Sequence, residues 1–233
     1  LNHCAPVTHL FSTLSIITPT VERYIIQVLR EHRYLLDSPA SQQLEGLVAQ
    51  EAIHSREHRR YNMGLKRAGL PVETVEGWWE GLLQMTTGRL RPKWFRLATV
   101  LMFEHHTAAM ASKLLRHPQL LDGAAPGYRE TWIWHSLEEL EHKSVSFDVW
   151  TCSVSSRWRQ YALRTLTWLV ISPPFWTFFW GSLAYILWAG RRKGNTAQDY
   201  WQLWKLLFGR HGIVSSNAWA WITYFNPHHH PWN

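Results

Sequence analysis

The sequence predicts an all-α protein built as a helical bundle. Apolar residues recur at helical spacing over several long stretches, each opened or closed by proline or glycine, and no stretch of useful length alternates as a strand would. With 233 residues the chain is long enough to bury a sizeable core. We expect a bundle domain over residues 1–155 and a hydrophobic, Trp-rich helical region over residues 156–233.

The amino-acid composition limits the kinds of molecule that this protein is expected to bind. The formal net charge of +7 suits either nucleic acid or an anionic membrane surface. The sixteen tryptophans crowd toward the C-terminal half and favour an aromatic belt at a membrane interface, so nucleic acid is not expected as a partner. Cys4 and Cys152 are too few for a disulfide scaffold, which indicates a reducing compartment.

The first two helices are placed by proline signals. Residues 1–17 lack a clear period and predict an arm or a short strand. Thr18 and Pro19 resemble an N-cap and a first-turn proline, which predicts that the first helix begins there. The second helix should begin at Ser38 and run to Gly69.

Three more helices follow in the bundle domain, at residues 73–87, 92–117 and 128–153. The first buries Trp78, Trp79 and two leucines and ends at Gly88, while Pro92 and Pro118 bound the next. The third contains the stretch WHSLEELEHKSVSFDVW. In this stretch His135, Glu139 and His142 are spaced four and three residues apart, which places them on one helix face.

Titratable side chains interrupt the apolar stripes of four of these helices. Such side chains are costly to bury unless they bind something, and a transition metal is the simplest candidate. Two helices carry Glu-x-x-His and two carry a lone inward glutamate, the arrangement of ferritin-like bundles that hold two metals. The sequence therefore predicts a ferritin-like four-helix bundle with these metal ligands: Glu22, Glu51, His54, Glu104, His135, Glu139 and His142.

Several assignments stay open at this level. His58 lies one turn past His54 and is a candidate eighth ligand, a partner of a ligand or a substrate-channel group. Glu138 competes with Glu139 for the same metal, and the choice rests on the Glu-x-x-His template. Glu22 would also suit the first turn of a helix for electrostatic reasons alone.

Two family resemblances rest on these residues. The seven-ligand pattern, with its extra histidine at position 135, looks like that of the di-iron arylamine N-oxygenases. The local sequences EAIHSREHRRYN, FEHHTA and WHSLEELEHKSVSFDVW, with the C-terminal HPW, resemble a bacterial family of predicted metal-dependent hydrolases over most of the chain. The second resemblance implies hydrolysis, whereas the ligand spacing argues more for redox chemistry.

Three functions follow as expectations. The first is a dinuclear non-haem iron oxygenase that acts with dioxygen on an apolar substrate, with two iron ions as cofactors and manganese or zinc as alternatives. The second is a metal-dependent hydrolase, in which the metals activate water. The third is a structural subunit of a membrane complex that retains a metal site.

The C-terminal region predicts membrane association. Residues 166–189 contain no charged residue, and Pro173 and Pro174 interrupt the run. Positive residues flank it on both sides: Arg157, Arg159 and Arg164 before it, and Arg191, Arg192 and Lys193 after it. Both ends should then face the cytoplasm, as in an interfacial hairpin at the inner face of a bacterial inner membrane. Expected partners are membrane lipid, an apolar small molecule, and either a membrane complex or a second copy of the chain.

Overall fold

The computed structural model describes residues 4–191, 195–210 and 212–231, and over these residues the protein is all-α. Two short 3-10 turns, Arg33–Leu35 and Pro118–Leu121, join helices of the bundle. The α-helices are α1 (Ala5–Arg30), α2 (Ser38–Arg67), α3 (Val72–Thr87), α4 (Lys93–Arg116), α5 (Pro126–Ser153), α6 (Arg157–Ala189), α7 (Ala197–Phe208) and α8 (Ile213–Thr223).

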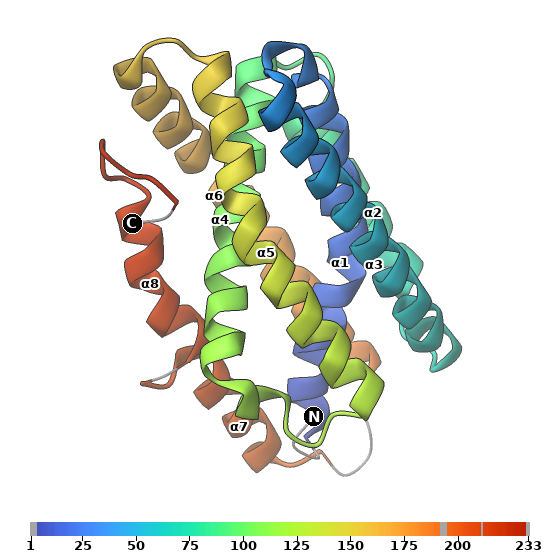
Figure 1. Cartoon of the computed structure of the whole chain (residues 1–233). Coiled ribbons are helices and arrows are strands. Elements are labelled where there is room, and N and C mark those ends of the chain that lie inside the picture. Colours follow the sequence, from blue (N-terminus) through green and yellow to red (C-terminus); the bar gives the residue numbers. More distant parts are fainter. Residues whose placement is uncertain (1–3, 192–194, 211, 232–233) are drawn as a thin grey trace.

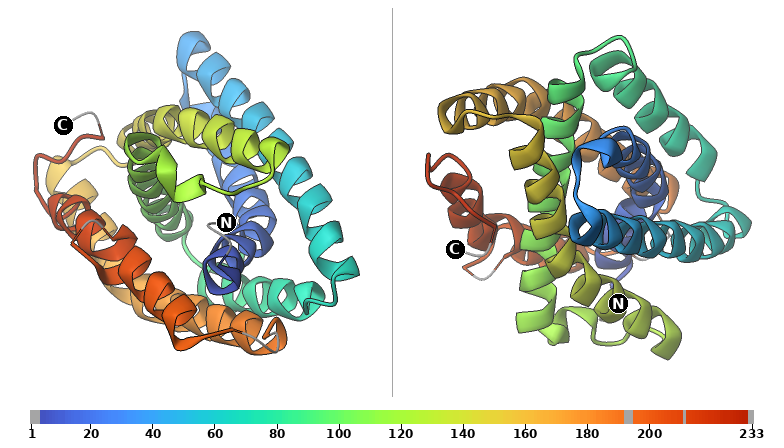
Figure 2. Two further views of the ribbon diagram at one scale, coloured as in Figure 1. Left: turned by 90° about the horizontal axis from the view of Figure 1, so that it is seen from below. Right: turned by 45° about the horizontal axis from the view of Figure 1, so that its top comes forward.

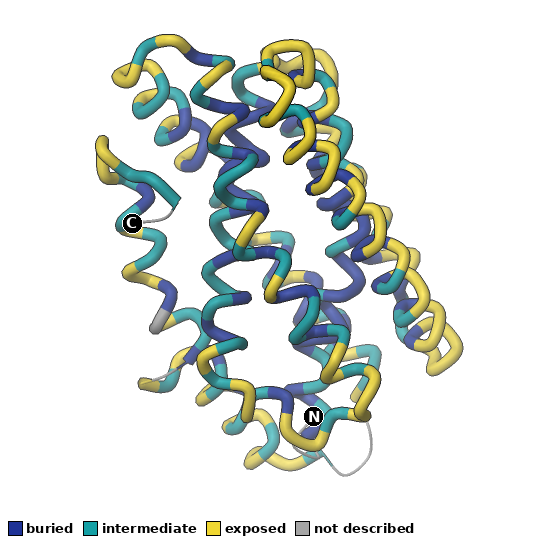
Figure 3. The backbone as a smooth tube through the Cα atoms, viewed as in Figure 1, coloured by how far each residue is buried: buried dark blue, intermediate teal, exposed yellow. Residues whose placement is uncertain are grey.

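Four helices enclose the centre of the molecule in two pairs. Helix α1 packs on α2 and α4 packs on α5, and the pairs meet where α2 contacts α5 and α1 contacts α4 (Figure 1). Helix α3 lies on the connection between the two pairs. Burial follows this arrangement, since α1 and α4 are buried along much of their length while α2 exposes one side (Figure 3).

Helix α1 is the central helix, and the prediction of an arm or strand over residues 1–17 is wrong. It contacts α2, α3, α4, α6 and α7, and the left view of Figure 2 shows it ringed by the other helices. Two of its polar side chains bond within the helix: Thr13 Oγ1 donates to the His9 carbonyl (2.8 Å) and Ser12 Oγ to the Thr8 carbonyl (3.0 Å). No residue from 5 to 17 is exposed, so this part of the helix has no polar face and its period is hidden in the sequence.

Pro19 does not open this helix but lies inside it. Thr18 caps nothing, because its Oγ1 donates to the carbonyl of Leu14 (2.9 Å) one turn earlier in α1. Glu22 therefore sits far from the N-terminus of α1, and the helix dipole gives no reason for its presence.

The predicted hairpin is also absent, since residues 157–189 form the single helix α6 with Pro173 and Pro174 inside it. Contacts with α4, α1 and α3 along its length offset the backbone hydrogen bonds that the prolines remove. Arg164 is not a free flanking charge, because it is buried and donates to the carbonyls of Tyr224 and Asn226.

Helix α6 is long and apolar enough to cross a membrane by length and composition, and 28% of its most apolar window is buried inside the protein. Arg192 and Lys193, the charges expected after it, lie outside the described residues.

The remaining predicted helix starts are close to those observed. Helices α2, α3, α4 and α5 begin within two residues of the predicted positions. Helix α7 begins after Thr196, and a reciprocal pair of hydrogen bonds between Thr196 and Asp199 caps it. Helix α8 was not separately predicted; it packs on α4 and α7, so the C-terminal helices cover one side of the bundle.

Candidate metal centre

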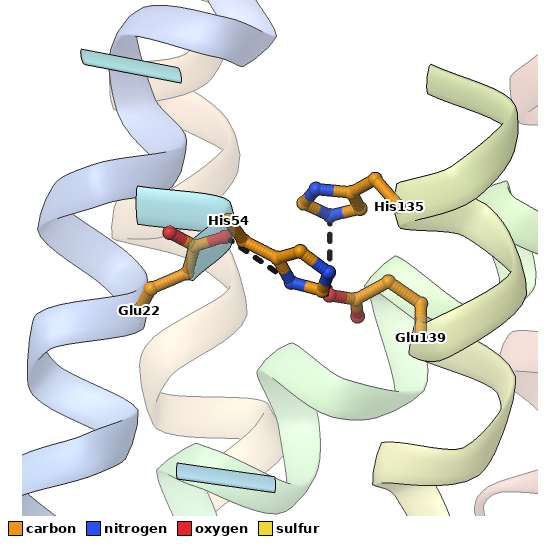
Figure 4. A group of neighbouring side chains, drawn as sticks. All are labelled: Glu22, His54, His135 and Glu139. Atoms are coloured by element: carbon orange, nitrogen blue, oxygen red, sulfur yellow. Dashed lines mark ion pairs between the residues drawn. The ribbon is translucent and has the colours of Figure 1, made fainter. Parts of the chain in front are cut away.

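The seven titratable residues predicted to interrupt the core stripes gather inside the bundle. Glu22 comes from α1, Glu51 and His54 from α2, Glu104 from α4, and the last three from α5: His135, Glu139 and His142. None is more than 7% exposed. Figure 4 shows Glu22 and His54 reaching toward His135 and Glu139 from the opposite side.

Six of these residues form two overlapping groups whose donor atoms lie within 4.8 Å of one another. The first group is Glu22, His54, His135 and Glu139, and the second is Glu51, His54, Glu139 and His142. The His54 Nδ1 atom lies 3.8 Å from Glu22 Oε1, 3.7 Å from Glu51 Oε2 and 3.7 Å from Glu139 Oε1. His135 Nε2 lies 3.1 Å from Glu139 Oε1, and His142 Nδ1 lies 3.3 Å from Glu51 Oε1.

Two of these spacings match donors that share a cation, and the three at His54 are a few tenths of an ångström wider. Donor atoms about 2.1 Å from a metal lie roughly 3.0 to 3.4 Å apart at octahedral or tetrahedral angles. The buried atoms without a hydrogen-bond partner include both oxygens of Glu22, Glu51 Oε2, His54 Nδ1 and His142 Nδ1. Among the described residues, no lysine or arginine forms an ion pair with Glu22, Glu51, Glu104 or Glu139. Buried carboxylates need a counter-charge, and a metal ion fits this donor set.

Each histidine of the centre uses its other nitrogen for a neighbouring side chain. His54 Nε2 lies 2.8 Å from Glu138 Oε2, and His142 Nε2 lies 3.1 Å from Gln50 Oε1. His135 Nδ1 lies 3.1 Å from a ring nitrogen of His58. Such contacts orient metal-binding imidazoles and raise their basicity. Glu138 therefore contacts the nitrogen of His54 that points away from the centre, whereas Glu139 faces the centre.

Two predicted ligands lie outside the two groups. His58 contacts the centre through His135. Its Nδ1 atom lies 2.8 Å from Ser15 Oγ, and its Nε2 atom contacts His135. Glu104 Oε1 accepts a hydrogen bond from Ser146 Oγ (3.0 Å), and its Oε2 atom is buried without a partner. For both residues, ligation stays a prediction.

Sequence reasoning did not find the residues that support the ligands. Gln50 and Ser15 are neutral polar residues without a periodic signal. Ser146 did carry one, because it lies four residues after His142 and so continues the face of α5 that holds the ligands.

Comparison with known families decides where the chain belongs. A model of the family described as predicted metal-dependent hydrolase matches residues 2–233. The chain belongs to this family. No curated protein and no solved structure matches the chain, so the likeness of its bundle to ferritin stays a prediction.

The buried charges of the centre shift the pKa values of several of its residues. Burial and the neighbouring Glu51 and Glu139 carboxylates raise the pKa of Glu22 well above its usual value. Burial alone would raise the pKa of Glu139, but the nearby imidazoles of His135 and His142 outweigh it and hold that pKa well below its usual value. For His142, the nearby carboxylates of Glu139 and Glu51 overcome burial and raise the pKa to about 11.

A cavity of about 130 Å³ opens beside the centre. Glu22, Glu51, His135 and Glu139 contribute to its wall, and most of the remaining wall is apolar side chains from α1, α4, α6, α7 and α8. One of its polar lining residues is His106 of α4. His106 Nδ1 lies 2.7 Å from the Met102 carbonyl, and burial lowers its pKa to about 3, so the ring is neutral.

Three glutamates of α5 provide a matched test of the centre. Glu139→Gln should abolish cation binding, because the two groups share this carboxylate. Glu138→Gln should weaken binding by about 10- to 100-fold, since only the hydrogen bond behind His54 changes. Glu141 is exposed, and Glu141→Gln should change nothing. Metal content after dialysis and titration calorimetry measure these effects, and full metal content in Glu139→Gln would contradict the assignment.

Cation binding should also release protons. His142 is protonated at neutral pH in the metal-free protein because its pKa lies near 11, and the raised pKa of Glu22 adds to the protons held there. A cation takes the place of these protons, so its apparent dissociation constant should fall by about tenfold per pH unit for each proton released. Calorimetry in two buffers of different ionisation enthalpy measures the number of protons. A binding heat that does not depend on the buffer would contradict this.

Proposed function

We propose that this chain is a metal-dependent hydrolase that acts on small, neutral, mostly apolar molecules. The observation that carries this proposal is the buried His/Glu cluster that forms one part of the wall of an apolar cavity. The family description gives the reaction class, and the cavity suggests the substrate class.

The residues of the cluster have distinct tasks in this proposal. Glu51, His54, Glu139 and His142 would hold a divalent cation, which when bound supplies Lewis acidity and lowers the pKa of water. Glu22 faces the cavity with two unpartnered oxygens, so one can turn to the cation and the other can take a proton from water. Its raised pKa makes this carboxylate a stronger base than a solvated glutamate.

The cavity wall favours a neutral substrate. It contains no lysine or arginine among its described residues, so no cationic side chain of the wall would pair with a carboxylate or phosphate. Outside the His/Glu cluster, two buried atoms of lining residues lack hydrogen-bond partners: His106 Nε2, which accepts because Nδ1 carries the proton, and Trp221 Nε1, which donates. An alcohol or a primary or secondary amide offers both complements, and an ester offers an acceptor for Trp221 Nε1. A 150 Å³ apolar cavity holds a molecule the size of benzene, which sets the scale of the substrate.

A second candidate is a dinuclear oxygenase with two iron ions, or with manganese or zinc in their place. The two donor groups overlap in His54 and Glu139, and a carboxylate such as Glu139 can bridge two cations. Four buried glutamates carry four negative charges when ionised, which two divalent cations would neutralise. Facing helices with two Glu-x-x-His pairs and two further glutamates are typical of di-iron carboxylate bundles.

One experiment separates these functions. The purified protein is analysed for metals and then assayed without oxygen on ethyl acetate and ethyl phosphate, two esters of about the size of benzene. We expect cleavage of the neutral ester alone, lost in Glu139→Gln and retained in Glu141→Gln. If the ester is not cleaved and the reduced iron-loaded protein changes its absorption on exposure to oxygen, the oxygenase replaces the hydrolase. A protein that binds no metal and cleaves nothing would favour a structural subunit.

Membrane association is proposed for the face formed by α7. Leu203 and Leu207 of this helix are buried, while four of its aromatic residues are each 42 to 47% exposed: Tyr200, Trp201, Trp204 and Phe208. Exposed aromatic side chains on an amphipathic helix suit the interface of a bilayer. Leu207 also lines the cavity, so an apolar substrate would have a short path from the lipid. The net charge of +7 favours the anionic cytoplasmic leaflet.

This proposal predicts binding to vesicles of anionic and zwitterionic lipid. The double variant Trp201→Ser, Trp204→Ser should reduce co-sedimentation by about tenfold or more, because it removes two interfacial indoles. Tyr34→Ser is the control, since Tyr34 is 71% exposed and lies on the turn between α1 and α2. Unchanged co-sedimentation of the double variant would contradict a lipid contact. If that variant instead shifts a dimer to a monomer, the face binds a second copy of the chain.

A further inference from the structure

We propose that His58 is a positioning residue: a buried relay of hydrogen bonds that begins at Pro19 fixes the tautomer of His135, leaving His135 Nε2 bare toward the metal centre. This inference rests on the metal centre of the proposed function. The relay uses Ser15 of α1, Asn62 and His58 of α2, and His135 of α5, and none of these side chains is more than 7% exposed.

The relay starts at the backbone carbonyl of Ser15, which lacks its usual helical donor because residue 19 is proline. In a regular α-helix the N–H of residue 19 would bond the carbonyl of Ser15, but proline has no N–H. Asn62 Nδ2 donates to this carbonyl instead, at 2.9 Å. A carbonyl only accepts, so the amide must present its nitrogen there, and the Oδ1 atom of Asn62 then faces the Ser15 hydroxyl at 2.9 Å.

The second step determines which atom receives the proton of the Ser15 hydroxyl. An amide oxygen only accepts, so Ser15 Oγ donates its single proton to Asn62 Oδ1. The same oxygen lies 2.8 Å from His58 Nδ1 and has no second proton to give. It therefore accepts, and the Nδ1 atom of His58 carries a proton.

In the third step, the tautomer of His58 determines the tautomer of His135, the candidate metal ligand. With its proton on Nδ1, a neutral His58 has a bare Nε2, which lies 3.1 Å from His135 Nδ1. His135 must donate across this contact, so its own Nε2 is bare. That atom lies 3.1 Å from Glu139 Oε1, where two lone pairs would repel unless a cation lies between them.

The reverse direction of the last bond would disable the ligand. If His58 donated from Nε2, a neutral His135 would carry its proton on Nε2, where the cation binds. For His58 to donate from both nitrogens it would have to be charged, yet it is only 2% exposed, packs against the His135 ring and forms no ion pair with any described carboxylate. The relay thus selects the one arrangement that leaves a lone pair for the metal.

Ser15→Ala tests the relay, with Ser12→Ala as a matched control. Both serines are buried on α1, but Ser12 donates to the Thr8 carbonyl and takes no part in the relay. The full-length protein is labelled with 15N-histidine and loaded with zinc as a diamagnetic probe. Long-range 15N–1H correlation spectra report which nitrogen of each ring carries the proton, and calorimetry gives the dissociation constant for zinc.

In the wild-type protein we expect His58 and His135 both protonated on Nδ1. Ser15→Ala should give mixed tautomers at His58 and weaken zinc binding by about 10- to 100-fold. Ser12→Ala should change neither, and Ser15→Thr, which keeps the hydroxyl, should restore both. A wild-type His58 with its proton on Nε2 would overturn the relay, as would equal zinc affinity of the two alanine variants.

The outcomes separate the relay from the metal centre itself. If Ser15→Ala does not fold, the tautomer of His58 in the wild-type protein still decides. If the wild-type protein binds no zinc, the metal centre is refuted, while the tautomer of His58 in that metal-free protein continues to test the relay.

Discussion

The repulsion among four buried glutamates is the constraint on which the rest of the structure depends. Glu22, Glu51, Glu104 and Glu139 come from four different helices and meet where almost no water reaches. Burial penalises every charge there, and the only cationic groups of the seven-residue set are imidazoles, which a metal would require in their neutral form. The bundle therefore holds together a set of donors that is complete only with a cation, and the orphaned atoms of the cluster mark where that cation belongs.

The helical spacing of apolar residues predicted the ligands on helices that have one solvent-exposed face and one buried face. Glu51 and His54 stood out on α2 because apolar residues surround them at helical spacing, and His135, Glu139 and His142 stood out on α5 for the same reason. The start of α1 was missed because no residue in its first thirteen positions is exposed, and because serines and threonines such as Ser12 and Thr13 bond to carbonyls one turn earlier in the helix. Pro19 then gave a false signal of a helix start, since local propensity cannot show that Asn62, far along the chain, replaces the lost donor.

The supporting layer of the centre shows a second limit of sequence reasoning. Glu138 and Glu139 are equivalent by composition, and only the position of His54 Nε2 distinguishes the residue behind the ligand from the one in front of it. The C-terminal run was misjudged as a hairpin because its two prolines break helices in isolation. In the folded protein α6 rests on three other helices, and tertiary packing outweighs the local cost.

The depth of the centre bears on how a metal enters and leaves. No donor is more than 7% exposed, and α1, which supplies Glu22, is covered by α2, α3, α4, α6 and α7. A chelator in solution cannot reach such an ion without the opening of the cavity wall or of a helix pair. The rate at which chelators strip the protein would then measure the opening of the bundle, and the metal present while the chain folds would be the one that persists.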